Sequence, residues 1–159
     1  MTGSNSKTDN RFTAEVNGGG RPLFSADKTE LSLKWRPDLG SYWHGHGGQL
    51  ISQPIDNQNA YLNVYVPEDV TIGTHEITKD GKDYRASYAL GNPGDIDEYP
   101  AVSGELILSV VPTAGDDRLE GTFWFKGVHE DGRQKVDVTS GEFKLTAQTA
   151  STPSTSKSE

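Results

Sequence analysis

The sequence predicts an all-β protein, either an antiparallel β-sandwich or a partly closed β-barrel, with about 8 to 10 strands. Three observations support this prediction. Apolar residues recur at every second position in many short segments, which places them on one face of a strand. Asp-Gly pairs and other turn residues separate these segments. Eighteen glycines and eight prolines leave no window of sustained helical periodicity, so a helix is expected only as one short piece near residues 94–99.

The expected strands follow one another along the chain. The first covers residues 11–16, RFTAEV, where Phe12, Ala14 and Val16 alternate with polar positions. Further segments of this kind are 31–35, 60–66, 104–111, 121–126, 135–138 and 141–145. Their apolar positions predict a core that includes Leu31, Leu33, Leu62, Val64, Leu106, Leu108, Phe123, Phe125, Val138 and Phe143.

Three turns are expected between these strands. Asp80-Gly81 and Asp131-Gly132 supply the positive φ angle that tight hairpins need, and AGDD at 114–117 separates two strand segments. A chain of 159 residues can bury a sizeable core without disulfides, and a single domain is expected over residues 11–147. Residues 1–10 lack periodicity and residues 148–159 are Ser/Thr-rich, so both are expected to be disordered tails.

Charge and composition exclude several classes of function. The formal net charge is −8 and no cluster of lysines and arginines occurs, which disfavours nucleic acid and anionic membrane surfaces as partners. No apolar run reaches the roughly 18 residues that a membrane-spanning helix needs. The chain has no cysteine, which rules out cysteine-ligated zinc, thiol redox chemistry and cysteine nucleophiles. A protein partner, a small polar ligand or a divalent cation remains compatible with the sequence.

The first ten residues are polar and have no apolar segment behind them, so they do not read as a secretory leader. The sequence as printed therefore predicts a cytoplasmic protein. A periplasmic or lipid-anchored location is the alternative, if a leader was removed.

The stretch from Leu62 to Leu145 has a recognisable layout. VPEDVTIGTHEI reads as the exit of one strand and a Gly-Thr-His entry into the next, and VSGELILSVV, GTFWF and a final GEFKL follow. This layout resembles a group of small bacterial all-β domains of unknown function, many of them lipoproteins or otherwise exported. Its motifs are turn glycines and core phenylalanines, so the resemblance implies a fold and offers no catalytic residues.

The segment YWHGHGG at 42–48 holds two of the four histidines of the chain and is the strongest candidate for a functional site. If it is extended, Tyr42, His44 and His46 share a face and the two imidazoles could bind one divalent metal ion, with a third ligand from His75, Glu76 or His129. The favoured interpretation is a flexible or edge segment, because its glycines supply no packing, with histidine pKa values near the unperturbed value of about 6.5. No cofactor is otherwise expected.

Aromatic side chains suggest a binding surface. Tyrosine and tryptophan rings beside amides such as Gln49, Asn57, Gln58 and Asn59 are suited to a sugar or a small amphipathic ligand. Trp124 is expected on the outer face of its strand, where an exposed indole marks an interaction site. The predicted ligand-binding residues are Tyr42, Trp43, Tyr61, Tyr65 and Trp124. Packing of Tyr61 and Tyr65 under a loop or against the second sheet, and of Trp124 against an aliphatic stem, is the alternative.

Two other segments carry weaker signals. GNPGDIDEYP gathers Asp95, Asp97 and Glu98, but it lacks the pattern of a helix-loop-helix calcium site and is read as a solvated acidic turn. NGGGRP at 17–22 lacks the Gly-Lys-Ser/Thr of a phosphate loop. The sequence thus predicts a non-catalytic binding module for a protein partner or a small polar ligand. The alternative is a metal-dependent or hydrolytic enzyme built around His44 and His46.

Overall fold

The computed structural model describes residues 10–17, 23–50, 59–92 and 94–147. All ten regular elements in this part of the chain are strands, and it contains no helix that could cross a membrane. The tails predicted at 1–10 and 148–159 lie outside the described residues, apart from Asn10. The strands are β1 (Arg11–Asn17), β2 (Leu23–Ser25), β3 (Lys28–Arg36), β4 (Gly40–Gln49), β5 (Asn59–Pro67), β6 (Gly73–Thr78), β7 (Arg85–Asn92), β8 (Asp95–Val110), β9 (Arg118–Val128) and β10 (Lys135–Thr146).

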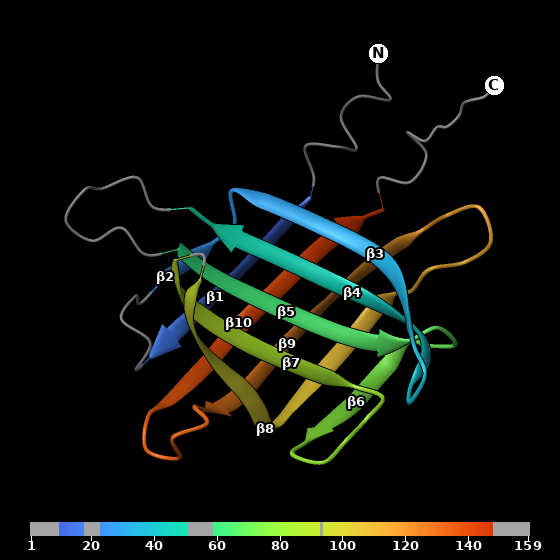
Figure 1. Ribbon diagram of the computed structural model, residues 1–159. Helices are drawn as coiled ribbons and strands as arrows, with labels where there is room; N and C mark the ends of the chain where they lie inside the picture. The colour runs from blue at the N-terminus through green and yellow to red at the C-terminus, as the bar shows by residue number, and fades with distance from the viewer. Residues whose placement is uncertain (1–9, 18–22, 51–58, 93, 148–159) are drawn as a thin grey trace.

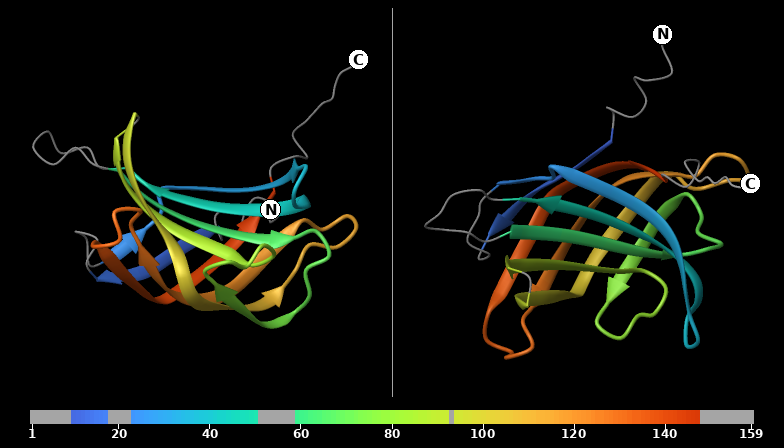
Figure 2. Two further views of the ribbon diagram at one scale, coloured as in Figure 1. Left: turned by 60° about the horizontal axis from the view of Figure 1, so that its bottom comes forward. Right: turned by 45° about the horizontal axis from the view of Figure 1, so that its top comes forward.

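The strands form one antiparallel sheet that curls back on itself. The order is β2-β1-β10-β9-β8-β7-β5-β4-β3, and β6 pairs with β8. In Figure 1 a front half, made of β3, β4, β5 and β7, crosses over a rear half made of β1, β2, β6, β9 and β10. The views in Figure 2 show the same curl from two other directions. The all-β prediction is confirmed, and the arrangement is a partly closed barrel.

Two corners join the halves. Residues 95–100 of β8 pair with β7 in the front half, while residues 101–110 pair with β9 in the rear half. At the other corner only Ala26 and Asp27 separate β2, which pairs with β1, from β3, which pairs with β4. The backbone N–H of Ala26 donates to Phe12 of the rear half, and that of Asp27 donates to Gly48 of the front half. Hydrogen bonding therefore continues across the bend.

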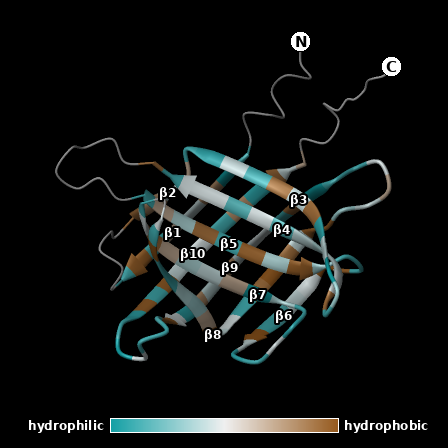
Figure 3. Cartoon of the chain, in the orientation of Figure 1, coloured by the Kyte–Doolittle hydropathy of each residue, from teal (hydrophilic) through white to brown (hydrophobic). Residues whose placement is uncertain are grey.

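The core lies between the two halves. Hydropathy alternates along the strands in Figure 3, as expected when one face of each strand packs inward. Nine of the ten predicted core residues are buried, and the exception is Leu33, which is 46% exposed. Leu33 and Trp35 follow the buried Leu31 on the same face of β3, but β3 is the last strand of the front half. No strand of the described sheet lies beyond β3 to cover them.

The segment YWHGHGG was expected to be flexible or at an edge, and this prediction is wrong. It forms β4, which pairs with β3 on one side and β5 on the other. Gly45 and Gly47 point into the core, where an added Cβ at Gly47 would lie 2.8 Å from Cβ of Phe12. The glycines thus let the front half approach the rear half closely.

The turn predictions have mixed outcomes. Residues 129–134 close the β9–β10 hairpin with Gly132 at φ 76°, and residues 114–117 turn between β8 and β9 with Gly115 at φ 83°, as predicted. The predicted hairpin at Asp80-Gly81 is wrong, because β6 and β7 both pair with β8 rather than with each other. The short helix expected at 94–99 is also wrong, because this segment is the start of β8 and pairs with β7.

Candidate ligand-binding face

Polar and aromatic side chains gather on the outer surface of β4, β5 and β7. Alternation along each strand turns them away from the core, while Trp43, Leu62, Val64 and Val66 point inward. We call this surface the front face and define it by Tyr42, His44, His46, Tyr61, Asn63, Tyr65, Arg85 and Ser87. The register places His44 opposite Tyr65, and Tyr65 opposite Arg85.

A hydrogen-bond network fixes both imidazoles of this face. The ammonium of Lys34 lies 2.9 Å from Nδ1 of His44 and has only donors, so Nδ1 accepts and Nε2 carries the proton. Nε2 of His44 then donates to Oδ1 of Asn63 at 2.8 Å, and Nδ1 of His46 donates to the same oxygen at 2.7 Å. The Asn63 amide donates in turn to the hydroxyl of Ser87 at 3.4 Å. Asn63 is therefore the centre of the network.

Burial keeps His44 neutral. The pKa of His44 is lowered to about 4, chiefly by desolvation and in part by the nearby ammonium of Lys34, while the hydrogen bond to Asn63 opposes the shift. The expectation of an unperturbed pKa is therefore wrong for His44. Burial also raises the pKa of the Tyr65 hydroxyl, and the carboxylate of Glu98 acts in the same direction. Neither the imidazole of His44 nor the phenol of Tyr65 is therefore charged near neutral pH.

Ring stacking orients the front face. The rings of His44 and Tyr65 are parallel to within 14° at a centroid distance of 4.6 Å, and those of His46 and Tyr61 stack at 5.6 Å. The guanidinium of Arg85 lies over the Tyr65 ring at 4.4 Å. Because side chains on neighbouring strands cover one another's faces, they present their edges outward. This arrangement favours hydrogen bonding at ring edges over the stacking of a sugar on ring faces.

Two polar groups on this face remain open. Among the described residues, no hydrogen bond ends on Nε2 of His46, whose lone pair is available when Nδ1 carries the proton. Arg85 forms no ion pair with any described residue, and its Nε is buried without an acceptor. A buried donor left unsatisfied costs about 1–3 kcal/mol. Arg85 was not found from the sequence, since a lone arginine at the start of a strand gives no signal.

Each open group lies beside a pocket. Arg85 lines a pocket of about 250 Å³, here called the seam pocket, which opens where β8 changes partner from β7 at Pro100 to β6 at Ser103. Its lining includes Tyr65, Ile77, Lys79, Ala86, Ser87, Glu98 and Ala101. His46 lines a second pocket of about 400 Å³ with Lys28, Thr29, Glu30, Gly48, Leu50 and Tyr61. An added Cβ at Gly48 would lie 3.7 Å from Nε2 of His46.

The proposed metal ligands do not gather in the described structure. His75 stacks on Tyr84 at 4.0 Å and bonds the carbonyl of Thr71, while Glu76 lies opposite Glu105 in the rear half. No group of three histidines, aspartates or glutamates suited to a metal ion occurs in the described ranges. Both ring nitrogens of His44 are engaged by Lys34 and Asn63, so only His46 offers a lone pair. The metal hypothesis stays a prediction without geometric support.

The predicted aromatic residues do not form one surface. Tyr42, Tyr61 and Tyr65 lie on the front face, but Trp43, which was predicted to bind ligand with them, is 6% exposed and packs in the core. Trp124 is 37% exposed and points outward from β9 in the rear half, as predicted. Its indole N–H donates to Glu105 at 3.2 Å. Asn57 and Gln58 lie outside the described residues.

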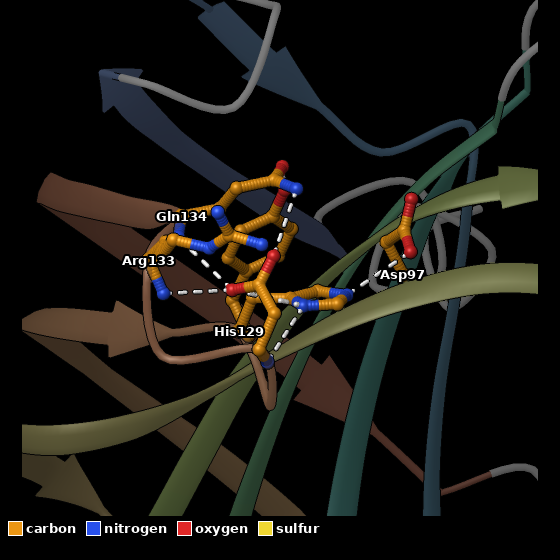
Figure 4. Close-up of polar contacts among 6 residues, drawn as sticks. Asp97, His129, Arg133 and Gln134 are labelled. Carbon is orange, nitrogen blue, oxygen red and sulfur yellow. Dashed lines mark hydrogen bonds and ion pairs between the residues drawn. The ribbon is translucent and has the colours of Figure 1, made fainter.

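A separate polar cluster surrounds His129. In Figure 4 this side chain lies between the β9–β10 hairpin and Asp97 of β8. Its Nε2 lies 3.0 Å from a carboxylate oxygen of Asp97, and its Nδ1 accepts the backbone N–H of Asp131 at 3.1 Å. The hydrogen bond to Asp97 raises the pKa of His129. The prediction of an acidic turn is wrong, because β8 contains Asp95, Asp97 and Glu98.

Comparison of the chain with protein-family models, with curated proteins and with solved structures finds no match in any of the three. The interpretation of the front face therefore depends on its own geometry.

Proposed function

We propose that the protein is a non-catalytic binding module that holds a small polar ligand on the front face. The observation that carries this proposal is the pair of open groups, the Nε2 lone pair of His46 and the guanidinium donors of Arg85. One accepts a hydrogen bond and the other donates, and each lines a pocket. Groups that the fold holds in place but does not use are suited to a ligand that supplies the missing partners.

The spacing of the strands indicates the size of this ligand. His46 belongs to β4 and Arg85 to β7, and only β5 lies between them. Neighbouring strands lie about 4.8 Å apart, and the register places Ser87 rather than Arg85 in line with His46, so the backbone positions of His46 and Arg85 are separated by roughly 12 Å. A compound of disaccharide or dipeptide size would reach from one group to the other.

An enzyme built on the two histidines is the less favoured alternative. His44 is held neutral by burial and has both ring nitrogens occupied, so it has no site left for proton transfer or metal binding. His46 alone would have to act as the base. The ordered network supports a role for the imidazoles in positioning a ligand.

The experiment is a titration of the isotope-labelled protein with neutral polar compounds, such as methyl glycosides and N-acetylated amino acid amides, followed by ¹H–¹⁵N correlation spectra. We expect shift changes to cluster on β4, β5 and β7, and to be lost in His46→Leu. The variant Trp124→Ala, on the opposite side of the core, is the matched control and should bind as the wild type does. Shift changes confined to residues around Trp124, or none with any compound, would refute the proposal.

A further inference from the structure

We propose that the seam pocket binds the carboxylate of a small organic acid, with Arg85 as the group that recognises it. This inference deepens the proposed function and rests on it, since the seam pocket is one end of the front face. It adds a chemical class of ligand that the face as a whole does not specify.

The first argument is the state of Arg85. Its guanidinium lies over the Tyr65 ring, with Cζ 4.4 Å from the ring centre and 5.6 Å from that of Tyr42, and these contacts hold it without using its N–H donors. Its Nε has no acceptor among the described residues. The planar set of N–H donors of a guanidinium held by cation–π contacts matches the two oxygens of a carboxylate. The guanidinium completes its hydrogen bonds when such an acceptor enters beside it.

The second argument is the charge of the pocket. Its lining carries Arg85 and Lys79 as cations and Glu98 as the single carboxylate, which gives it a surplus of positive charge in a protein of net charge −8. Glu98 forms no ion pair with Arg85 in the described structure, so Arg85 is not neutralised. A singly charged carboxylate balances this surplus. A phosphate dianion would exceed it, and the carboxylate of Glu98 would repel the excess negative charge.

The third argument is the composition of the pocket floor. Ile77, Ala86 and Ala101 are core residues that line its inner side, with 1%, 4% and 8% of their surface exposed. Between Pro100 and Ser103, β8 pairs with neither β7 nor β6 on this edge of the described sheet, and the pocket opens there onto these apolar side chains. The ligand is therefore an acid with a compact apolar body, whose carboxylate lies against Arg85 and Ser87.

The test compares benzoate with benzamide, and propionate with propionamide, because each pair differs in charge and little in shape. Binding is followed by the backbone signals of residues 77–79, 85–87 and 98–101. We expect the two acids to bind at the seam at least about tenfold more tightly than their amides. An amide is neutral and has one carbonyl oxygen, so it cannot accept two hydrogen bonds from the guanidinium as a carboxylate does. Equal binding of acid and amide would overturn the inference.

Three variants sharpen the test. Arg85→Gln should lose benzoate binding while its circular dichroism spectrum stays that of the wild type. Lys79→Gln, at an exposed position, should weaken benzoate binding severalfold without affecting the fold, and it keeps the inference testable if Arg85→Gln does not fold. Glu98→Gln should tighten benzoate binding because it removes the repelling carboxylate. Unchanged affinity for benzoate in either Arg85→Gln or Lys79→Gln would overturn the inference.

The outcomes separate this inference from the proposed function. If neither acid binds at the seam but neutral compounds still shift residues of the front face, the carboxylate assignment fails and the proposed function stands. Tighter binding of inorganic phosphate than of benzoate would also overturn the assignment. If no compound of any class shifts the front face, both fail.

Discussion

Asn63 determines the geometry of the two imidazoles on the front face. It is 8% exposed, and its single carbonyl oxygen accepts N–H donors from both His44 and His46. An amide oxygen with two lone pairs fits this role, and a leucine at this position would leave both donors unpaired. In the sequence Asn63 stands between Leu62 and Val64 of a strand and gives no indication of this role.

The low pKa of His44 makes stability depend on acid pH. In the unfolded chain this histidine binds a proton near pH 6.5, whereas in the folded protein its pKa is about 4. The contribution of this difference to stability is complete above pH 6.5 and is lost as the pH falls toward 4. We expect a loss of about 2 kcal/mol from this residue, after allowing for solvent screening.

Urea unfolding of the wild type and of His44→Gln across this range measures the effect, since glutamine does not titrate. Asn63→Asp is the second variant, and its carboxylate should raise the pKa of His44 because it stabilises the imidazolium. The account of His44 is contradicted if its ring signals titrate near pH 6.5 in the wild type.

We expect His129 to give stability a pH dependence opposite to that from His44. Its pKa is raised above the ordinary value by Asp97, so its contribution to stability is present below about pH 6.5 and is lost as the pH rises through the folded-state pKa. In Asp97→Asn this dependence should weaken, because Asp131 alone then favours the charged imidazole, and a comparison of thermal unfolding between about pH 6 and pH 9 would detect the change. An identical pH dependence in the wild type and the variant would show that the contact does not favour the charged imidazole.

At the scale of the element, β4 shows what inward glycines do. Gly47 faces Cβ of Phe12, which is fully buried and cannot move aside. We expect Gly47→Ala to destabilise the protein by about 1–3 kcal/mol through overpacking. Gly48→Ala is the matched control, because its Cβ would make ordinary contacts of 3.4 Å with Tyr61, and its effect should stay within about 0.5 kcal/mol. Equal effects in urea unfolding would contradict the close approach of the two halves.

The elements differ in how well the sequence predicts them. β1, β5, β9 and β10 alternate clearly between apolar and polar positions and were predicted. β4 was missed because its inward positions are partly glycine, which carries no hydrophobic signal. β7 was missed because Ala86, Ser87, Tyr88 and Ala89 are all buried, so the strand does not alternate. For the start of β8 the sequence predicts an acidic turn or a short helix instead of a strand, because only Tyr99 of this segment packs inward and the acidic residues give no apolar alternation.

The same reasoning applies to the site. The shared face of Tyr42, His44 and His46 follows from period two and was predicted from sequence. Arg85, Ser87 and the seam pocket depend on the partner change of β8, where distant segments meet. The local pattern of apolar and polar residues does not indicate which distant strands pair.

At the scale of the molecule, a cluster of phenylalanines holds the rear half together beneath the front strands. The ring of Phe123 lies 5.7 Å from that of Phe12 and 5.8 Å from that of Phe143. Phe123→Ala should therefore cost about 3–5 kcal/mol, which chemical denaturation would measure. The exposed Trp124→Ala is the neighbouring control, with an expected cost below about 1 kcal/mol. A small effect at Phe123 would mean that the core is not organised around this ring.

The central claim is that the network across β3, β4 and β5 holds His46 with Nε2 free for a ligand. The most direct measurement is a long-range ¹H–¹⁵N correlation spectrum of the histidine side chains near neutral pH, with His44→Gln and His46→Gln used to assign the signals. The account predicts that His44 carries its proton on Nε2 and that neutral His46 carries its proton on Nδ1. A His46 protonated on Nε2 in its neutral form, or two imidazoles that exchange freely between tautomers, would contradict it.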